Sequence, residues 1–435
     1  MKIYLIKSLL LLLVISSMVT SRNGFALDTD KVLDNKVKVT EISYAKQLTF
    51  YSDILQENQS MNVYLPSNFD IASSEHTYPV VFINGGHGSK FFLTLSGIVK
   101  HMSELDRMPE SIVVSLNSGG YSPSVYTNGM WRSRDKLNGD AEPEKYIQHL
   151  TQELFPFLEN RYRASDHRTI VGVSGSALFP LYSFTHAPEI FDNYILLAAM
   201  DMIGMGYVEG ENIIDLMQKT LKKQIKKGAD IPSSFYFAMS DDDLDDEEGR
   251  YNRNILNLKQ KMNTFAGNNF KFELDVIANE RHYDAFIKAM LSSIELMYPV
   301  DKWAPKYRDL AKSELKGIKG IDNHYEKLSA EYGFTILPKA DRWNSANSLK
   351  TMGFFALRDG RYSEALDYTN RWIKYRPESV RGYDQLSEVY EAKQDLQQAL
   401  NAKQKVIELA RKQIDPQLKN YQQELVELNN RIQGK

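Results

Sequence analysis

The chain of 435 residues contains no cysteine. This absence excludes disulfide bonds, a lipid-modified cysteine anchor and any metal site built from thiolates. A chain without disulfides must be held together by its hydrophobic core, and 43% apolar residues over this length can supply a large one. We therefore expect an ordinary globular protein of about two domains.

A strong charge of one sign is also absent. Lysine and arginine number 53 against 56 aspartates and glutamates, so the formal net charge is -3 and the sequence pI is near 6.3. Proteins that bind nucleic acid or an anionic membrane surface usually carry an excess of positive charge. Neither partner is expected for this chain.

Long apolar runs are confined to the N-terminus. Lys2 and Lys7 begin the chain, an apolar stretch from Leu9 to Val19 follows, and residues 24–26 (Gly-Phe-Ala) offer a small-residue cleavage site. The pattern predicts a signal peptide over residues 1–26, a periplasmic or secreted protein, and no membrane span in the mature chain. An uncleaved anchor is the alternative, which the short apolar length disfavours.

Strand-like and helix-like runs alternate between residues 37 and 300. The first two strands alternate in polarity, which indicates an antiparallel pair, whereas 79–83 and 111–116 are continuous apolar runs typical of buried parallel strands. The predicted strands are 47–51, 61–65, 79–83, 111–116, 169–171, 194–198, 234–239 and 272–277, and the predicted helices include 145–162 and 284–297. This order predicts an α/β protein with a doubly wound, mostly parallel sheet.

A serine at a sharp turn is the most informative feature of the sequence. Residues 168–182 read RTIVGVSGSALFPLY, where a β-branched run precedes Ser174 and apolar residues at helical spacing follow it. Gly172 and Gly175 let the backbone turn tightly, so the Ser174 hydroxyl can stand exposed at the end of the strand. This is the nucleophile elbow expected of an α/β-hydrolase, here with the pattern G-x-S-x-S.

A nucleophilic serine needs a histidine base, which in this fold follows the last strand. His282 has that position, in the polar loop between the last predicted strand and the helix after it. His87 lies in a glycine loop and could line the pocket, whereas His186 on the helix after the elbow would point away. The remaining histidines are expected at the surface: His76, His101, His149, His167 and His324.

The base needs a carboxylate that orients the imidazole and stabilises its cation. Four aspartates follow the strand 234–239, namely Asp241, Asp242, Asp243 and Asp245. Most members of such a cluster belong to a solvated loop or a weak cation site. One is expected to be the orienting acid, and we favour Asp243 over Asp241.

The oxyanion that forms during acyl transfer needs backbone donors. Gly175 supplies one amide because it follows the nucleophile, and the other comes from the loop after an earlier strand. That loop is residues 84–88 (Asn-Gly-Gly-His-Gly), in which we choose Gly86. A phosphate-binding loop is the alternative, but the GxxxxGK[ST] and GxGxxG spacings are absent. We expect no cofactor and no metal.

Together these segments resemble the esterase family of α/β-hydrolases that includes siderophore esterases, feruloyl esterases and S-formylglutathione hydrolases. Residues 60–66 (SMNVYLP) and 78–82 (YPVVF) are similar to the family's opening, and residues 132–135 (RSRD) to a loop of its siderophore-esterase branch. Residues 155–163 and the elbow region also match in order. The resemblance implies an α/β-hydrolase fold over residues 47–298, with Asp243 as the acid and His282 as the base.

Three positions depart from the family pattern. Val173 replaces the usual histidine before the serine, Ser176 replaces a glycine, and Pro180 falls within the helix after the elbow, where it removes a backbone donor. An altered pocket or a chain that has lost its activity would be consistent with these changes.

The C-terminal part differs in composition. After about residue 340 it is rich in Glu, Gln, Lys, Leu and Ala, and Ala365-Leu366 recurs 34 residues later as Ala399-Leu400. This period resembles tetratricopeptide repeats, one good and one degenerate, followed by a capping helix over 417–433. A plain helical hairpin packed on the hydrolase is the alternative. The predicted parts are a hydrolase domain (37–300), a helical connector (301–342) and a small all-α repeat domain (343–435).

The sequence therefore predicts an exported serine esterase that hydrolyses a carboxylic ester through an acyl-enzyme, with Ser174, His282 and Asp243 as its triad. The expected substrate is a small-molecule or siderophore-like ester, and the repeats could bind a protein partner or a second copy of the chain. Two alternatives stay open at this point. One is a noncatalytic periplasmic scaffold that acts through its repeat helices, and the other is an acyltransferase on the same fold.

Overall fold

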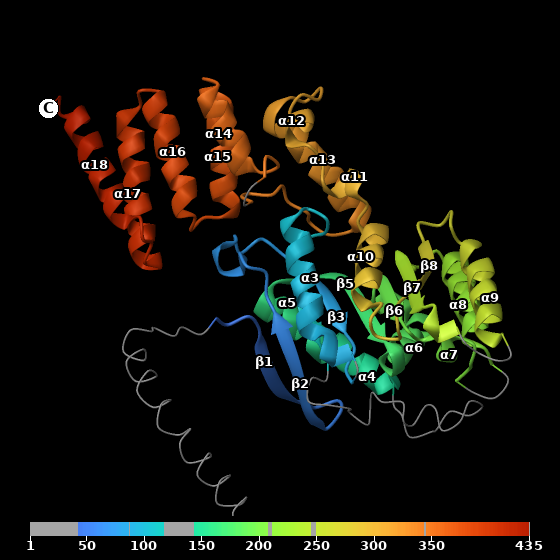
Figure 1. Ribbon diagram of the computed structural model, residues 1–435. Coiled ribbons are helices and arrows are strands. Elements are labelled where there is room, and N and C mark those ends of the chain that lie inside the picture. Colours follow the sequence, from blue (N-terminus) through green and yellow to red (C-terminus); the bar gives the residue numbers. More distant parts are fainter. Residues whose placement is uncertain are drawn as a thin grey trace, which may run out of the picture. The chain divides into compact units, whose positions relative to one another are not determined.

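The computed structural model describes residues 42–86, 88–116, 143–207, 211–244, 249–342 and 345–434. The predicted signal peptide, His87, Asp245 and the RSRD loop at 132–135 lie outside the described residues. Residues Ala45–Lys435 form one compact unit, in which an α/β region is followed by a run of helices (Figure 1).

The α/β region is built on a mostly parallel sheet of eight strands. Their order is β1-β2-β4-β3-β5-β6-β7-β8, and the β1–β2 and β2–β4 pairs are antiparallel whereas the others are parallel. The strands are β1 Lys46–Ser52, β2 Glu57–Tyr64, β3 Tyr78–Ile83, β4 Ile112–Ser115, β5 Ala164–Val173, β6 Asn193–Leu197, β7 Ser234–Ser240 and β8 Lys271–Ile277. Every predicted strand is confirmed, with shifted ends.

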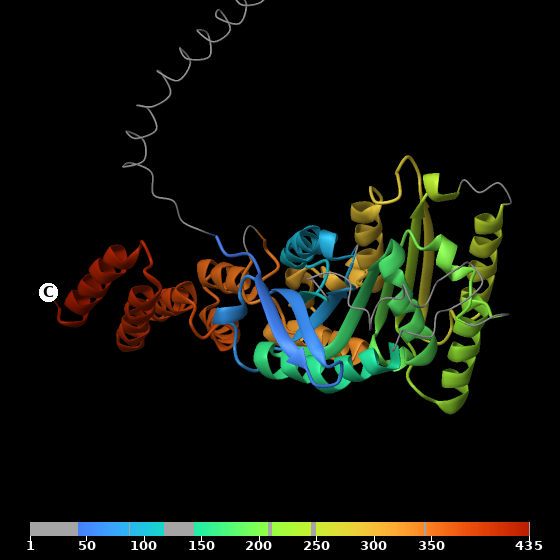
Figure 2. The ribbon, with the colours of Figure 1, turned by 90° about the horizontal axis from the view of Figure 1, so that it is seen from below.

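Helices cover both faces of this sheet (Figure 2). Side chains alternate across a strand, so Val80 and Phe82 of β3 face one core while Val81 and Ile83 face the other. The first core is covered by α4, α5, α6, α8 and α9, and the second by α3 and α10. The helices are α3 Phe92–Glu104, α4 Pro143–His149, α5 Phe155–Tyr162, α6 Leu178–His186, α7 Met200–Ile203, α8 Ile213–Lys227, α9 Arg250–Asn263 and α10 Phe286–Met297.

Two histidines expected at the surface are buried, which corrects that prediction. His149 Nδ1 lies 3.0 Å from Ser52 Oγ and 2.6 Å from the Glu153 carboxylate. The ring of His167 packs against Phe334, with 4.7 Å between ring centroids. Burial lowers the pKa of both imidazoles, which favours their neutral form inside the protein. Ser52 and Phe334, which contact these two rings, are distant from them in the sequence, so the local context gave no sign of burial.

Within the described residues, the chain after the sheet contains helices and connecting loops but no strand. Its helices are α11 Val300–Trp303, α12 Tyr307–Leu310, α13 Gly317–Tyr332, α14 Leu349–Arg358, α15 Tyr362–Tyr375, α16 Val380–Ala392, α17 Leu396–Gln413 and α18 Leu418–Ile432. Ser348, Ser379 and Asp395 accept backbone N–H groups at the starts of α14, α16 and α17, as N-cap residues do. The predicted all-α region is confirmed, whereas its assignment to tetratricopeptide repeats stays a prediction. Among the described residues, no helix is both long and apolar enough to cross a membrane.

The helical region shares a hydrophobic core with the sheet. One continuous cluster of buried side chains runs from the sheet through α3 and α10 to Trp303, Tyr325 and Trp372. The Tyr332 hydroxyl donates a hydrogen bond to the Met297 carbonyl at 2.7 Å, which joins α13 to the end of α10. The domain boundaries at 300 and 342 stay a prediction, but the core does not end at either of them.

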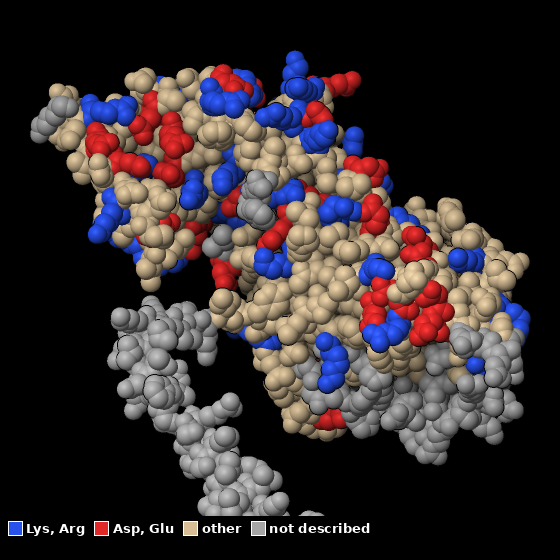
Figure 3. Space-filling model, in the orientation of Figure 1, with Lys and Arg blue, Asp and Glu red and all other residues tan. Residues whose placement is uncertain are grey.

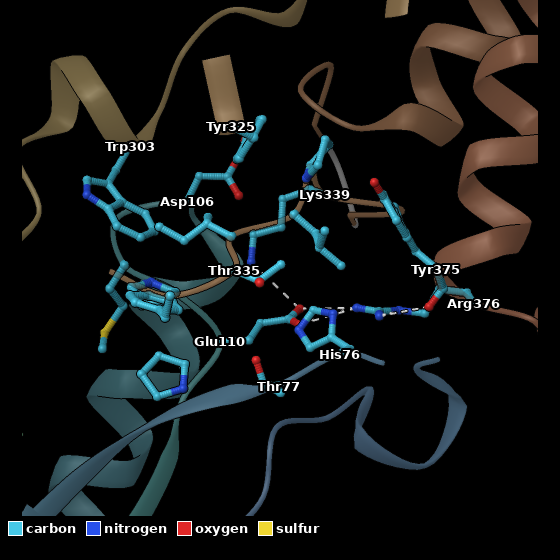
Figure 4. Close-up of a pocket in the computed structure, with 18 residues that line it drawn as sticks. His76, Thr77, Asp106, Glu110, Trp303, Tyr325, Thr335, Lys339, Tyr375 and Arg376 are labelled. Atoms are coloured by element: carbon cyan, nitrogen blue, oxygen red, sulfur yellow. Dashed lines mark hydrogen bonds and ion pairs between the residues drawn. The ribbon is translucent and has the colours of Figure 1, made fainter. Parts of the chain in front are cut away.

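A charged cluster also joins the two regions (Figure 4). It lies before β4, and because β4, β3 and β5 are parallel, this is the end of the sheet opposite to Ser174. Glu110, just before β4, accepts a hydrogen bond from Arg376 Nη2 at 3.2 Å. His76 Nε2 and Lys339 Nζ lie 3.8 and 3.7 Å from the same carboxylate. Burial disfavours the charged form of Glu110, but the positive charges of Lys339 and Arg376 outweigh it and lower its pKa to about 2. The ionised Glu110 carboxylate is therefore the ion-pair partner of the buried Arg376.

Candidate active site

Ser174 stands at the carboxyl end of β5, in the middle of the sheet. Its φ of +51° lies in the left-handed region, which is rare for residues other than glycine and marks a strained turn. A 3-10 turn over Ser174–Ala177 follows, and then α6. The predicted strand, turn and helix of a nucleophile elbow are therefore present in that order.

The residues beside the serine explain how the chain can turn. A Cβ atom at Gly172 would lie 2.5 Å from the Cα of Ala177, so a side chain there would push the turn away from the strand. The Ser176 hydroxyl donates to the Val173 carbonyl and accepts from the Val173 N–H, both at 2.8 Å. The serine that replaces a family glycine therefore bonds within the turn.

His282 approaches Ser174 from the loop between β8 and α10. Its Nε2 lies 2.9 Å from Ser174 Oγ, and its Nδ1 lies 2.7 Å from Asp243 Oδ1. A carboxylate can only accept, so Nδ1 carries the proton and Nε2 presents its lone pair to the serine hydroxyl. The His282 side chain is 39% exposed and that of Asp243 only 17%, so the imidazole can be reached from solvent while the acid is shielded.

Asp243 lies in the short 3-10 turn Asp242–Leu244 after β7. Its Oδ2 accepts the Ser240 N–H at 3.3 Å, and the Asp243 N–H donates to Ser240 Oγ at 3.1 Å. Burial disfavours its charge, but the hydrogen bonds from His282 and Ser240 outweigh this effect and lower the pKa of Asp243. The carboxyl group therefore stays ionised at neutral pH.

Asp241 has a role that sequence reasoning missed. Its Oδ2 accepts the Asn279 N–H at 2.9 Å and its Oδ1 the Glu280 N–H at 3.4 Å. These bonds join the end of β7 to the loop that carries His282, so Asp241 positions the loop and not the ring. The signal that could have found it is the pairing of β7 with β8, which brings the two loops together.

The loop after β3 lies against the elbow because β3 and β5 are neighbours. The Asn84 N–H donates to the Val171 carbonyl at 2.8 Å, and Asn84 Nδ2 donates to the Ser176 carbonyl at 2.7 Å. Gly86 is buried with φ +67°, and Gly175 directly follows the serine. The two residues predicted to form the oxyanion hole thus belong to loops that meet at the same edge of the sheet.

Aromatic side chains from the segment just before α3, from the histidine loop and from the start of α10 lie near the histidine. The Tyr283 ring meets the His282 ring edge to face, with 4.6 Å between centroids. Phe91 stacks on Phe286 at 4.4 Å and lies 5.9 Å from Tyr283. In the described part of the chain, no group of three or more His, Asp or Glu side chains is arranged to hold a metal ion.

Comparison with known proteins identifies the relatives of this fold. The family model described as "Putative esterase" matches residues 52–226, a segment that contains Ser174 but neither Asp243 nor His282. Over that segment, the resemblance noted in the sequence is confirmed. No curated protein sequence matches the chain.

Two solved structures share the fold at low sequence identity. An IroE-like serine hydrolase from Shewanella oneidensis is 15% identical with a TM-score of 0.56, covering 75% of this chain and 98% of that one. An uncharacterised protein from Capnocytophaga ochracea is 13% identical with a TM-score of 0.51, covering 87% of this chain and 99% of that one. The α/β-hydrolase fold is therefore confirmed. A match over 87% of the chain necessarily includes part of the helical region.

Proposed function

We propose that this chain is an exported serine esterase, which hydrolyses a carboxylic ester through an acyl-enzyme. The observation that carries the proposal is the line of hydrogen bonds from Asp243 through His282 to Ser174, at a strained turn on the carboxyl edge of the sheet. The esterase family match over residues 52–226 supports the same class of reaction.

The proposed reaction has two halves. Ser174 Oγ attacks the ester carbonyl while its proton passes to His282 Nε2, and the amides of Gly86 and Gly175 donate to the oxyanion. The bond to the leaving oxygen then breaks, and His282 returns the proton to the departing alcohol. In the second half, water attacks the acyl-enzyme with His282 again as base, which releases the acid and restores Ser174. Asp243 stabilises the imidazolium in both halves.

Labelling and hydrolysis together test this proposal. A fluorophosphonate probe and p-nitrophenyl acetate should both react with the mature protein, and small siderophore and feruloyl esters are the first natural substrate types to try. Ser174→Ala should lower kcat/KM on the order of 10³-fold or more, because triad members act as a unit. Ser363→Ala, an exposed serine on α15, is the matched control. Labelling or turnover that survives in Ser174→Ala would remove the serine from its proposed role.

Export is the second part of the proposal. Removal of residues 1–26 would take away Lys2, Lys7 and Arg22 and no acidic residue, so the formal charge would change from -3 to -6. The intact mass of the protein recovered from a periplasmic extract checks this, since the mature chain should begin at Leu27. A full-length chain in the membrane fraction would support the uncleaved anchor.

A further inference from the structure

A basic groove lies where α12 and α13 meet α14 and α15. It is open to solvent, and five cationic and two acidic side chains are among the residues that line it. The cationic ones are Arg308, Lys312, Lys316, Arg358 and Arg361. Figure 3 shows lysine and arginine gathered on the surface over these helices. The lining therefore has an excess of three positive charges.

The acidic residues of the groove already have partners. Asp359 is 3.0 Å from Arg358 Nη2 and 3.3 Å from Arg361 Nη2, and Glu364 also pairs with Arg361. Arg308 lies over the ring of Phe355 at 4.3 Å. Among the described residues, none forms an ion pair with Arg308, Lys312 or Lys316. These three side chains carry the charge that the groove leaves uncompensated.

The groove is also lined by a tyrosine whose hydroxyl has no partner in the described part of the chain. Tyr368 is fully buried, and no described residue forms a hydrogen bond with its hydroxyl. A Cβ atom built on Gly317 would lie 4.0 Å from that hydroxyl oxygen, so the hydroxyl faces the start of α13. Burial raises the pKa of Tyr368 to about 12, so the group keeps its proton and can donate. A buried donor of this kind is costly unless something accepts from it.

The start of α13 lies at the same groove. The helix begins at Gly317 without a capping side chain, and both Lys316 and Gly317 line the groove. Lys316 has φ +51° and ψ +153°, a conformation that residues other than glycine rarely adopt. The N–H groups of Lys316 and Gly317 donate to the Ser313 and Ala311 carbonyls, so it is the positive end of the dipole of this 16-residue helix that favours an anion.

We propose that the basic groove binds a multiply charged oxyanion, a ligand that carries a phosphate group or several carboxylates. The ligand's charge offsets Arg308, Lys312 and Lys316, and one of its oxygens accepts from the Tyr368 hydroxyl. The site is separate from the triad in sequence and in its donors, so it does not depend on the proposed esterase activity.

Calorimetric titration of the full mature chain with pyrophosphate and with citrate, at low ionic strength, tests the proposal. At least one anion should bind saturably, and Lys312→Ala/Lys316→Ala should weaken binding about tenfold or more, since charge-assisted hydrogen bonds are lost. Tyr368→Phe removes only the hydroxyl and should weaken binding several-fold. Lys327→Ala is the control, because Lys327 is exposed on α13 outside the groove lining.

Each outcome decides for or against the site. Binding of pyrophosphate alone indicates a phosphate ligand, citrate alone a polycarboxylate, and both support the shared chemistry. The proposal fails if neither anion saturates the protein at millimolar concentration, or if Lys327→Ala weakens binding as much as the double variant. The two groove lysines are exposed, so their variant should fold even if Tyr368→Phe does not. Ester hydrolysis by the double lysine variant at the rate of the unchanged protein would show that the variant is folded.

Discussion

Asp241 and Asp243, two residues apart after β7, allow a test of which aspartate orients the catalytic histidine, because they accept hydrogen bonds from different groups. Asp243 Oδ1 accepts from His282 Nδ1 at 2.7 Å. In Asp243→Asn the amide nitrogen can donate to Nδ1, which would move the imidazole proton to Nε2. His282 could then no longer accept the proton of Ser174. A comparable change in a Ser-His-Asp protease lowers kcat about 10⁴-fold, which corresponds to about 5 kcal/mol of transition-state stabilisation.

Asp241→Asn is the matched comparison, since the change in charge and size is the same. Asp241 accepts backbone N–H groups from Asn279 and Glu280, and those bonds lower the pKa of Asp241. An asparagine keeps one carbonyl oxygen that can accept one of the two bonds. The histidine loop should therefore shift little, and we expect a loss of at most about tenfold.

Steady-state kinetics with p-nitrophenyl acetate at neutral pH separate the two variants, and circular dichroism checks that both are folded. The reasoning predicts that kcat falls by orders of magnitude for Asp243→Asn alone. If Asp241→Asn were the more damaging change, the acid would have to be Asp241. Small and equal losses would indicate a Ser-His dyad, and the short Nδ1–Oδ1 distance would then have no catalytic meaning.

Three further predictions concern stability and the elbow. Folding lowers the pKa of Glu110 from 4.5 to about 2, which corresponds to about 3 kcal/mol of stability, so Glu110→Gln should lower the free energy of unfolding in urea titrations by about that amount. Glu295→Gln, which removes the carboxylate of an exposed ion pair, is the control and should change the free energy of unfolding little. Because this folded-state pKa is depressed, the same stability is present above pH 4.5 in the unchanged protein and is lost as pH falls towards 2. A chain ending at residue 300 should aggregate or melt far below the full chain in thermal scans, and a soluble fragment of near-native activity would show that the shared core is dispensable. Ser176→Gly should retain esterase activity within about tenfold, because within the described part of the chain its hydroxyl bonds only the Val173 backbone, and a larger loss would place Ser176 in the reaction.

The strands and the elbow could be predicted because their signals are local. The central strands β3 and β4 contain continuous apolar runs, and the turn at Ser174 is enclosed by Gly172 and Gly175. The chain order of serine, acid and histidine in this fold then directed attention to two loops, those after β7 and β8. The structure brings Ser174, His282 and Asp243 together from these places.

Features set by long-range contacts could not be predicted in the same way. Four aspartates in one short loop look equivalent in sequence, and only the pairing of β7 with β8 shows that Asp241 holds the histidine loop. His149 and His167 were expected at the surface, yet Ser52 contacts His149 from 97 positions away and Phe334 packs on His167 from more than a hundred positions away. Periodicity shows which face of an element is buried but not what covers that face.

The sequence also did not show that the helical region packs against the helix that follows the catalytic histidine. The amphipathic helices of that region were interpreted as a separate domain, although the apolar stripe of each helix could equally be covered by other repeats or by the sheet. The structure covers part of it with α10, the helix that begins four residues after His282. The far end of α10 is held by the Tyr332 hydroxyl on the Met297 carbonyl and by Trp303 against Tyr298, with 4.9 Å between their ring centroids. The residues after 300 therefore support the helix from which the histidine loop extends, so the placement of His282 depends on a part of the chain that contributes no residue to the triad.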